Sequence, residues 1–206
     1  MSYYDAPTSG VSLKYPVATG DTVLVKCAIS YTSAENALAN LDSELTHWNF
    51  DQACADSRAE WNRYLGRIEV KGGTEAQQTK FYTDLWHALL GRHKIDDANG
   101  CFTEFYPYYT DGTRQGSQTV NVKYHTRTLP KDNQGQARFH MYSSDAFWLT
   151  QWNLNILWGL AWPEVQDDFA ACLVQYARNG GLLPRGPVAG GYSYIMTTCP
   201  ATPLIT

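Results

Sequence analysis

Residues 144–155 (SDAFWLTQWNLN) combine the types of side chain with which proteins bind sugars. Tryptophan rings stack on the apolar faces of sugar rings, while carboxylate and amide groups hydrogen-bond to sugar hydroxyls in a convergent pocket. If the segment is helical, four side chains share one face: Trp148, Gln151, Trp152 and Asn155. Asp145 and Asn153 add polar groups to the same segment. An aromatic core helix with hydrogen-bonded amides has the same composition, so both interpretations remain open.

A second candidate segment is rich in glycine and follows soon after the first. Residues 180–194 (GGLLPRGPVAGGYSY) hold glycines that permit positive φ angles and close backbone approach. Arg185 and Tyr192 supply hydrogen-bond donors within it. The alternative is an ordinary surface loop, but polar and aromatic residues at a helix end are more typical of a substrate-binding loop.

Other residue types that commonly carry chemistry lack the necessary spacing. The five histidines form no i, i+4 pair and no HExxH motif, so we do not expect a metal centre built on them. Residues 96–100 (DDANG) lack the spacing of a calcium-binding loop and are expected to form a tight turn. Cys199 has no nearby base or orienting group, which favours a packing role over a nucleophilic one.

Three helices are predicted in the first half of the chain. The first follows a capping box of Thr32 and Glu35 and carries an apolar stripe: Ala34, Ala37, Leu38, Leu41 and Leu45. The second runs from residue 51 to residue 65, with Gly66 as its stop signal. The third opens on a capping box of Thr74 and Gln77 and ends at Gly91.

Two further helices contain or adjoin the candidate segments. One is expected to begin near Ser144 and to end at Trp162, and the next has Pro163 in its first turn. The inward face of that next helix is apolar: Val165, Phe169, Cys172, Leu173 and Tyr176. Gly180 and Gly181 end it. Paired helices joined by long loops suggest an α/α toroid or a solenoid.

Strands are expected in two regions of the chain. Residues 21–31 alternate in polarity after a turn at Gly20, with four residues on one side: Val23, Val25, Cys27 and Ile29. Because such a strand needs partners, we expect the chain to begin inside a β domain. Residues 94–142 lack helical periodicity and are expected to form a small β excursion, in which three residues alternate: Val120, Val122 and Tyr124.

The composition excludes several classes of protein. Of 206 residues, 44% are hydrophobic and 14% aromatic, which excludes a disordered chain. The net charge of −4 and the lack of a basic run argue against nucleic-acid binding. No segment approaches the ~20 apolar residues of a membrane span, and no signal peptide is visible. The five widely spaced cysteines are interpreted as mostly buried single thiols.

Four stretches of the chain, in this order, resemble glycoside hydrolase family 92, the calcium-dependent exo-α-mannosidases. Residues 25–37 (VKCAISYTSAENA) resemble the last strand of the family's N-terminal β-sandwich and its entry into linker helices. Residues 61–70 (WNRYLGRIEV) and 81–89 (FYTDLWHAL) resemble the entry to the (α/α)6 catalytic domain. Residues 179–185 (NGGLLPR), followed by Gly191, Tyr192 and Met196, resemble an active-site loop.

The resemblance implies a mainly α chain with a β portion. Residues 1–32 would be the tail of the β-sandwich, residues 33–66 the linker helices, and residues 67–206 the first part of the toroid. The implied activity is inverting removal of terminal α-linked mannose from glycans, with calcium as cofactor and a secreted or periplasmic location. An acid Glu and a base Asp, with carboxyl groups ~6.5–9.5 Å apart, are expected beyond residue 206, as are the calcium ligands. We therefore expect the chain alone to be inactive.

The resemblance also suggests roles for the candidate residues. Trp148 and Trp152 would form a stacking wall, and four residues would contact sugar through polar groups: Asp145, Asn153, Arg185 and Tyr192. Many members carry Trp-Asp-Thr where this chain has Trp-Leu-Thr at 148–150, and Gly-Asp-His-Ala where it has Thr-Cys-Pro-Ala at 198–201. These departures indicate a divergent branch. Two alternatives follow, namely a mannosyl phosphodiester hydrolase of the same family and a non-catalytic carbohydrate-binding protein.

Overall fold

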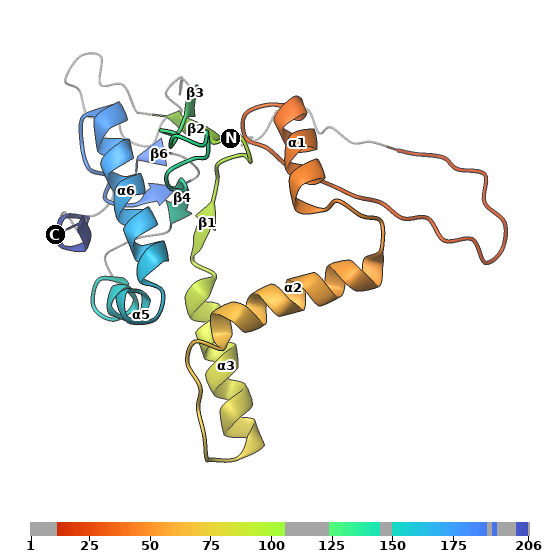
Figure 1. Ribbon diagram of the computed structural model, residues 1–206, viewed down its shortest axis with the longest axis horizontal. Coiled ribbons are helices and arrows are strands. Elements are labelled where there is room, and N and C mark those ends of the chain that lie inside the picture. The colour runs from red at the N-terminus through yellow and green to blue at the C-terminus, as the bar shows by residue number, and fades with distance from the viewer. Residues whose placement is uncertain (1–11, 106–123, 145–149, 189–190, 193–200, 206) are drawn as a thin grey trace, which may run out of the picture.

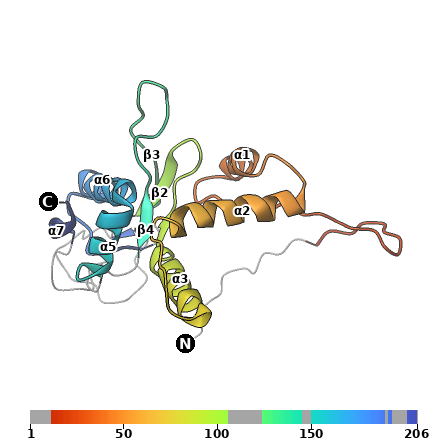
Figure 2. The ribbon, with the colours of Figure 1, turned by 60° about the horizontal axis from the view of Figure 1, so that its bottom comes forward.

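The computed structural model describes residues 12–105, 124–144, 150–188, 191–192 and 201–205. The helices are α1 (Ala34–Glu44), α2 (Phe50–Leu65), α3 (Glu75–Leu89), α5 (Leu154–Ala161), α6 (Pro163–Gly180) and α7 (Thr202–Ile205). The strands are β1 (Arg92–Lys94), β2 (Cys101–Phe105), β3 (Tyr124–Thr128), β4 (Tyr142–Ser144), β5 (Pro187–Val188) and β6 (Gly191–Tyr192). Two views place α5 and α6 on one side of β4, and α1 and α2 on the other (Figure 1, Figure 2). The predicted class, mainly α with a β portion, is confirmed at this level.

The described strands form two small sheets. β1 pairs with β4 antiparallel, so that His93 lies opposite Ser143. The other sheet has the order β3-β2-β6-β5, in which the β2–β6 contact is parallel and the other contacts are antiparallel. The predicted β excursion is therefore present between α3 and α5, and the predicted turn closes at Gly100, whose N–H donates to the Asp97 carbonyl at 2.7 Å. Val120 and Val122 lie outside the described residues.

Local capping signals set the start of α3 and both ends of α6 as predicted, whereas α3 ends at Leu89, before the predicted Gly91. Thr74 accepts a hydrogen bond from the Gln77 N–H at 3.3 Å, and the Gln77 side chain accepts one from the Thr74 N–H at 2.8 Å. α6 begins at Pro163, and Gly181 caps its C-terminal end with a φ of +81°, in the left-handed region that favours glycine.

The start of α1 differs from the prediction. Ser33, rather than Thr32, caps the helix by accepting a hydrogen bond from the Asn36 N–H at 3.1 Å. The Thr32 hydroxyl instead donates to the carboxylate of Asp97, so the predicted capping box is not formed. The apolar stripe is not the buried face either, because Leu38 is 64% exposed while Asn40 is buried. α2 ends before Gly66 as predicted.

The predicted strand at 21–31 is not formed in this chain. No described strand pairs with this segment, and Val25 and Ile29 are exposed. An extended segment becomes a strand only when a neighbour completes the hydrogen-bond ladder. The turn before it is confirmed by Gly20, with a φ of +97°. The beginning of the chain inside a β domain stays a prediction.

The core lies between α6 and the strands. All four residues of α6 with no exposed surface were predicted to face inward: Phe169, Cys172, Leu173 and Tyr176. They pack against a cluster that includes Phe102, Leu129 and Met141. Because the cluster joins residues from β2 to α7, it holds the second half of the chain together.

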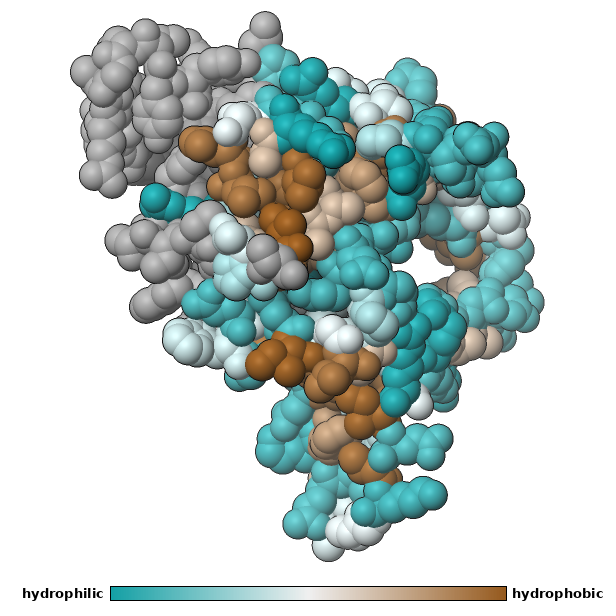
Figure 3. Space-filling model, turned by 60° about the vertical axis from the view of Figure 1, so that its left-hand side comes forward, coloured by the Kyte–Doolittle hydropathy of each residue, from teal (hydrophilic) through white to brown (hydrophobic). Residues whose placement is uncertain are grey.

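Two expectations are corrected by burial and strand pairing. Ser144 pairs with Arg92 at the end of β4, and the single helix expected from there to Trp162 is interrupted, because residues 151–153 form a turn between the helical Thr150 and α5. Residues 145–149 lie outside the described residues. Cys172 is buried as expected, but Cys27 and Cys54 are exposed. Apolar side chains also gather on the surface over the lower part of the molecule, where α3 and α5 lie (Figure 3). Among the described residues, no helix is long and apolar enough to span a membrane.

Candidate functional site

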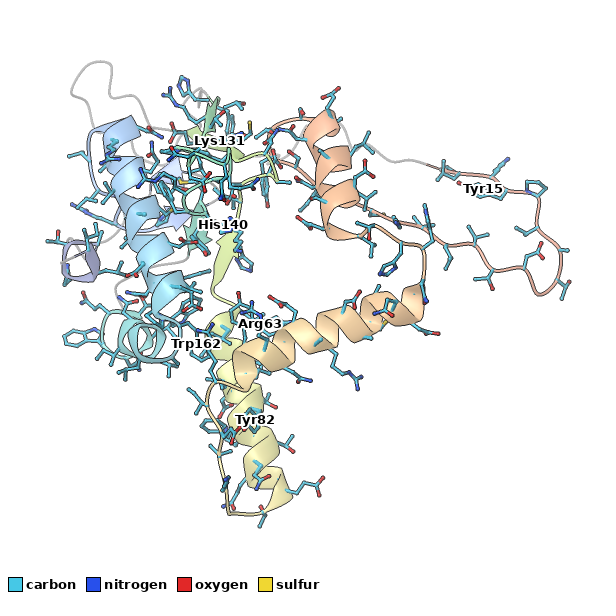
Figure 4. The ribbon with its side chains drawn as sticks, viewed as in Figure 1. Tyr15, Arg63, Tyr82, Lys131, His140 and Trp162 are labelled. Atoms are coloured by element: carbon cyan, nitrogen blue, oxygen red, sulfur yellow. The ribbon has the colours of Figure 1, made fainter. Side chains whose placement is uncertain are left out.

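A pocket of about 530 Å³ lies where the end of α2 meets β1, β4, α5 and the start of α6. This volume is within the range of small-molecule binding sites. Figure 4 labels three of its residues, Arg63, His140 and Trp162. They come from three different parts of the chain, so the pocket exists only in the folded protein.

Aromatic side chains line the pocket from two sides. Trp61 and Tyr64 come from α2, where a spacing of three residues places them on one face. Tyr142 of β4 and Trp158 of α5 are almost fully buried. Trp162 is fully buried, and its indole N–H has no hydrogen-bond partner among the described residues, which leaves a donor beside the pocket. Such rings suit the apolar faces of a sugar.

Ion pairs fix the rim of the pocket. Arg67 donates to the Ala161 carbonyl at 2.9 Å and pairs with Glu164 at 2.6 Å, which attaches the end of α2 to the junction of α5 and α6. Its guanidinium lowers the pKa of Glu164. Arg63 pairs with Glu60 at 2.6 Å on the same rim. The positive and negative side chains named here at the rim are therefore paired with one another.

His140 and Asp168 form the polar part of the pocket. The carboxylate of Asp96 lies 2.9 Å from Nδ1 of His140 and also accepts the Met141 N–H at 2.8 Å, so it holds the imidazole in place. Burial raises the pKa of Asp168, although the nearby imidazole of His140 and a hydrogen bond from the His140 backbone oppose the shift. The carboxylate of Asp168 can accept a hydrogen bond from a hydroxyl group that enters the pocket.

Arg92 supports the side of the pocket that α5 and α6 form. Its guanidinium lies 4.0 Å from the ring centre of Phe169 and 4.9 Å from that of Trp158. It also donates to the amide oxygens of Gln166, at 3.1 Å, and Asn155. Arg92 thereby joins β1 to both α5 and α6, and it orders the wall that Trp158 provides.

Of the sequence-predicted site residues, those that the structure describes do not line this pocket. Trp152 is 69% exposed, and Asn153 is the N-cap residue of α5 but makes no side-chain hydrogen bond to the helix. Neither residue lines the pocket. Asn155, which was expected beside them, contacts Arg92. Asp145 and Trp148 lie outside the described residues. The predicted stacking wall therefore stays a prediction.

The other two predicted residues lie in the loop after α6. Arg185 is half-buried there, and Tyr192 belongs to strand β6 next to β5. The loop is anchored by Asn179, which donates to the buried carboxylate of Glu104 at 2.8 Å. Arg127 pairs with the other oxygen of Glu104 at 2.7 Å. This network fixes the start of the loop against β2.

Sequence reasoning missed most of the pocket residues. His140, Asp168 and Trp158 belong to no sequence motif, and the sequence places Asp96 only in a turn. The signal was present in part, because residues 61–70 and 81–89 had been singled out by family resemblance. The contact between Asp96 and His140 could not be predicted from the sequence, because the two residues are 44 positions apart and no local pattern connects them.

The described residues do not fit a calcium site. No group of three or more His, Cys, Asp or Glu side chains among them is placed to hold a metal ion. The carboxylates of Asp96 and Asp97 are instead occupied by hydrogen bonds from protein donors.

Comparison with known families gives a match over most of the chain. The model described as the glycosyl hydrolase family 92 catalytic domain matches residues 36–206. No curated protein is similar enough to count as a match.

Solved structures of mannosidases share the fold. The family GH92 inverting mannosidase BT2199 of Bacteroides thetaiotaomicron is 24% identical with a TM-score of 0.62, over 85% of this chain and 21% of that one. The α-mannosidase BT3965 of the same organism is 21% identical with a TM-score of 0.65, over 85% and 20% of the two chains. BT3965 has also been solved in complex with mannoimidazole at the same similarity. This chain spans about a fifth of the length of these proteins.

Proposed function

Because the chain belongs to glycosyl hydrolase family 92, we propose that it forms part of an enzyme that removes terminal α-linked mannose from glycans by an inverting mechanism. The family match over residues 36–206 is the observation that carries this proposal. The fold shared with BT2199 and BT3965, which are described as mannosidases, supports it. In this proposal residues 1–32 are the tail of a β-sandwich, residues 33–66 are linker helices, and residues 67–206 open an (α/α)6 toroid.

The proposed role of the described residues is to bind the glycan. A sugar ring in the pocket would stack on Trp61 or Tyr64, and its hydroxyls would hydrogen-bond to His140 and Asp168. The rigid supports of these groups, Asp96 and Arg92, reduce the entropy lost on binding.

Catalysis is proposed to depend on residues outside this chain. In an inverting glycosidase an acid protonates the leaving oxygen while a base activates water across a gap of ~6.5–9.5 Å. We assign neither role to a residue of this chain. Calcium and a secreted or periplasmic location are likewise proposed from family resemblance, with the calcium ligands outside the chain.

The proposal is tested by titrating the 206-residue chain with methyl α-mannoside and following tryptophan fluorescence and NMR signals. We expect binding that Trp61→Ala weakens and that Trp48→Ala, at an exposed tryptophan outside the pocket, leaves unchanged. Trp152→Ala is the informative third variant, because it removes the sequence-predicted wall without touching the pocket. Loss of binding in Trp152→Ala alone would move the sugar site from the pocket to the start of α5.

Hydrolysis is tested on a longer protein that contains this chain, with α-mannobiose as substrate and with a calcium chelator as control. Inverted product and loss of activity with chelator are the expected results. Binding without turnover would favour the non-catalytic alternative. The phosphodiester alternative has less support, because the pocket lining carries as many carboxylates as fixed cations.

A further inference from the structure

The carboxylate of Asp97 is surrounded by side-chain donors from the N-terminal part of the chain. One oxygen accepts hydrogen bonds from Ser30 at 2.9 Å, from Asn36 at 3.1 Å and from the hydroxyl of Thr32. The other oxygen accepts one from Asn40 at 2.8 Å. All four donors lie 57 to 67 residues away in the sequence, in the segment that leads into α1 or on α1 itself.

The contact is reinforced by hydrogen bonds in the opposite direction. The amide oxygen of Asn40 accepts the Ala98 N–H at 2.8 Å, and that of Asn36 accepts a hydrogen bond from Asn99 at 2.9 Å. Thr103 donates to the Tyr31 carbonyl at 2.6 Å. The turn after β1 and the start of α1 therefore form one polar junction with matched donors and acceptors.

This junction depends on the ionised carboxylate. Asp97 is 4% exposed, and among the described residues no cation pairs with it. Burial raises the pKa of Asp97, but the hydrogen bonds from Thr32, Asn40, Ser30 and Asn36 outweigh that effect and leave the pKa below its usual value. Replacement of this carboxylate by an amide would turn one acceptor oxygen into an NH2 group. That group would face other hydrogen-bond donors and lose the bonds that the oxygen accepts.

Apolar packing contributes little to the attachment of α1, because Ala37 and Leu41 are only partly buried. Asn40 is its buried residue, while Leu38 is largely exposed. α1 is therefore attached through the polar junction, with a smaller contribution from Lys26, which donates to the Leu45 carbonyl at 2.6 Å.

The position of α2 follows from that of α1. α2 has no buried residue of its own, and its contact with α3 lies near its C-terminal end, where Trp61 packs edge-on against Trp86 with ring centres 6.0 Å apart. Arg67 holds the C-terminal end against Ala161 and Glu164. The N-terminal end follows α1 after the short link of residues 45–49, and Figure 1 shows α2 crossing the molecule between these two attachments.

We infer that Asp97 is a positioning residue: by holding α1 against the turn after β1, it fixes the angle of α2 and so the place of Trp61 and Tyr64 in the pocket. Its effect on sugar binding rests on the proposed function, whereas its effect on α1 and α2 does not.

The test compares the wild-type chain with Asp97→Asn and with Asp42→Asn, a matched control that removes one exposed carboxylate from α1 without touching the junction. Hydrogen exchange measured by mass spectrometry reports on α1. In Asp97→Asn we expect amide exchange in residues 34–44 to accelerate about tenfold or more, with α6 unchanged. Exchange in α1 equal to that of the control would overturn the inference. Asn36→Ala, which removes fewer hydrogen bonds, is the milder variant if Asp97→Asn does not fold.

A distance measurement tests the positioning of α2 directly. Spin labels are placed on Cys54 of α2 and on Asp167→Cys of α6, both exposed, with the other reactive cysteines replaced by serine. We expect one narrow distance distribution when Asp97 is intact and a broad one in the Asp97→Asn variant, at unchanged protection of α6. Identical distributions would overturn the positioning role.

Sugar affinity then separates this inference from the proposed function. We expect Asp97→Asn to bind methyl α-mannoside several-fold more weakly than the Asp42→Asn control. If the wild-type chain binds no sugar, the proposed function of the pocket fails, while the distance measurement still decides the role of Asp97.

Discussion

Replacement of Cys172 tests how the core supports the pocket. Lys94 and Tyr142 form a pair without ladder hydrogen bonds, because the neighbouring Ile95 N–H donates to the Met141 carbonyl at 2.9 Å. The Tyr142 N–H therefore points away from β1, and Sγ of Cys172 on α6 accepts it at 3.2 Å. The thiol thus covers an open edge of β4.

The expected cost of Cys172→Ala has two parts. A buried N–H without a partner costs about 1–3 kcal/mol. The loss of one buried heavy atom and the small void it leaves adds about 1 kcal/mol. The sum is about 2–4 kcal/mol of unfolding free energy. Cys172→Ser keeps an acceptor for the Tyr142 N–H and should recover about half of this loss, since the first part then largely disappears.

Urea denaturation followed by circular dichroism measures both variants against the wild type. The slope of the transition must stay constant for the comparison to report on stability alone. If alanine cost less than about 0.5 kcal/mol, or if serine were no more stable than alanine, the thiol would not be satisfying the Tyr142 N–H and the reasoning would be refuted.

Three further predictions follow from capping, titration and exposure. Thr74→Ala should cost about 1 kcal/mol by removing the capping box of α3, seen as faster amide exchange in its first turn. Burial raises the pKa of Asp168 above its usual 3.8, so its contribution to stability is present below about pH 4 and is lost as pH rises through the folded-state pKa. Urea titrations from about pH 3 to about pH 7 should therefore show Asp168→Asn gaining stability relative to the wild type as the pH rises. A thiol reagent should label the exposed Cys27 and Cys54 in the folded chain, but Cys172 only after unfolding, because burial raises the pKa of its thiol.

Elements with strong local signals were predictable from the sequence. The capping box of Thr74, the proline start of α6 and its glycine end depend on residues within one turn of each other. The inward face of α6 was likewise visible, because helical periodicity selects Phe169 and its neighbours regardless of what they pack against.

Predictions failed where a distant partner competed with a local one. Thr32 fits a capping box, but its hydroxyl is used by Asp97, 65 residues away. The stripe of α1 is apolar, yet the buried contact is made by Asn40.

The sequence by itself therefore determined the family, the main helices and the face of α6 that builds the core. Only the tertiary structure shows that Asp96 and Asp97, which belong to one turn, have different hydrogen-bond partners. Asp96 contacts His140, whereas Asp97 accepts hydrogen bonds from α1. The physical reason is that capping and periodicity act over a few residues, whereas a buried carboxylate takes its role from the donors that folding brings to it. Those donors come from segments that no local pattern connects.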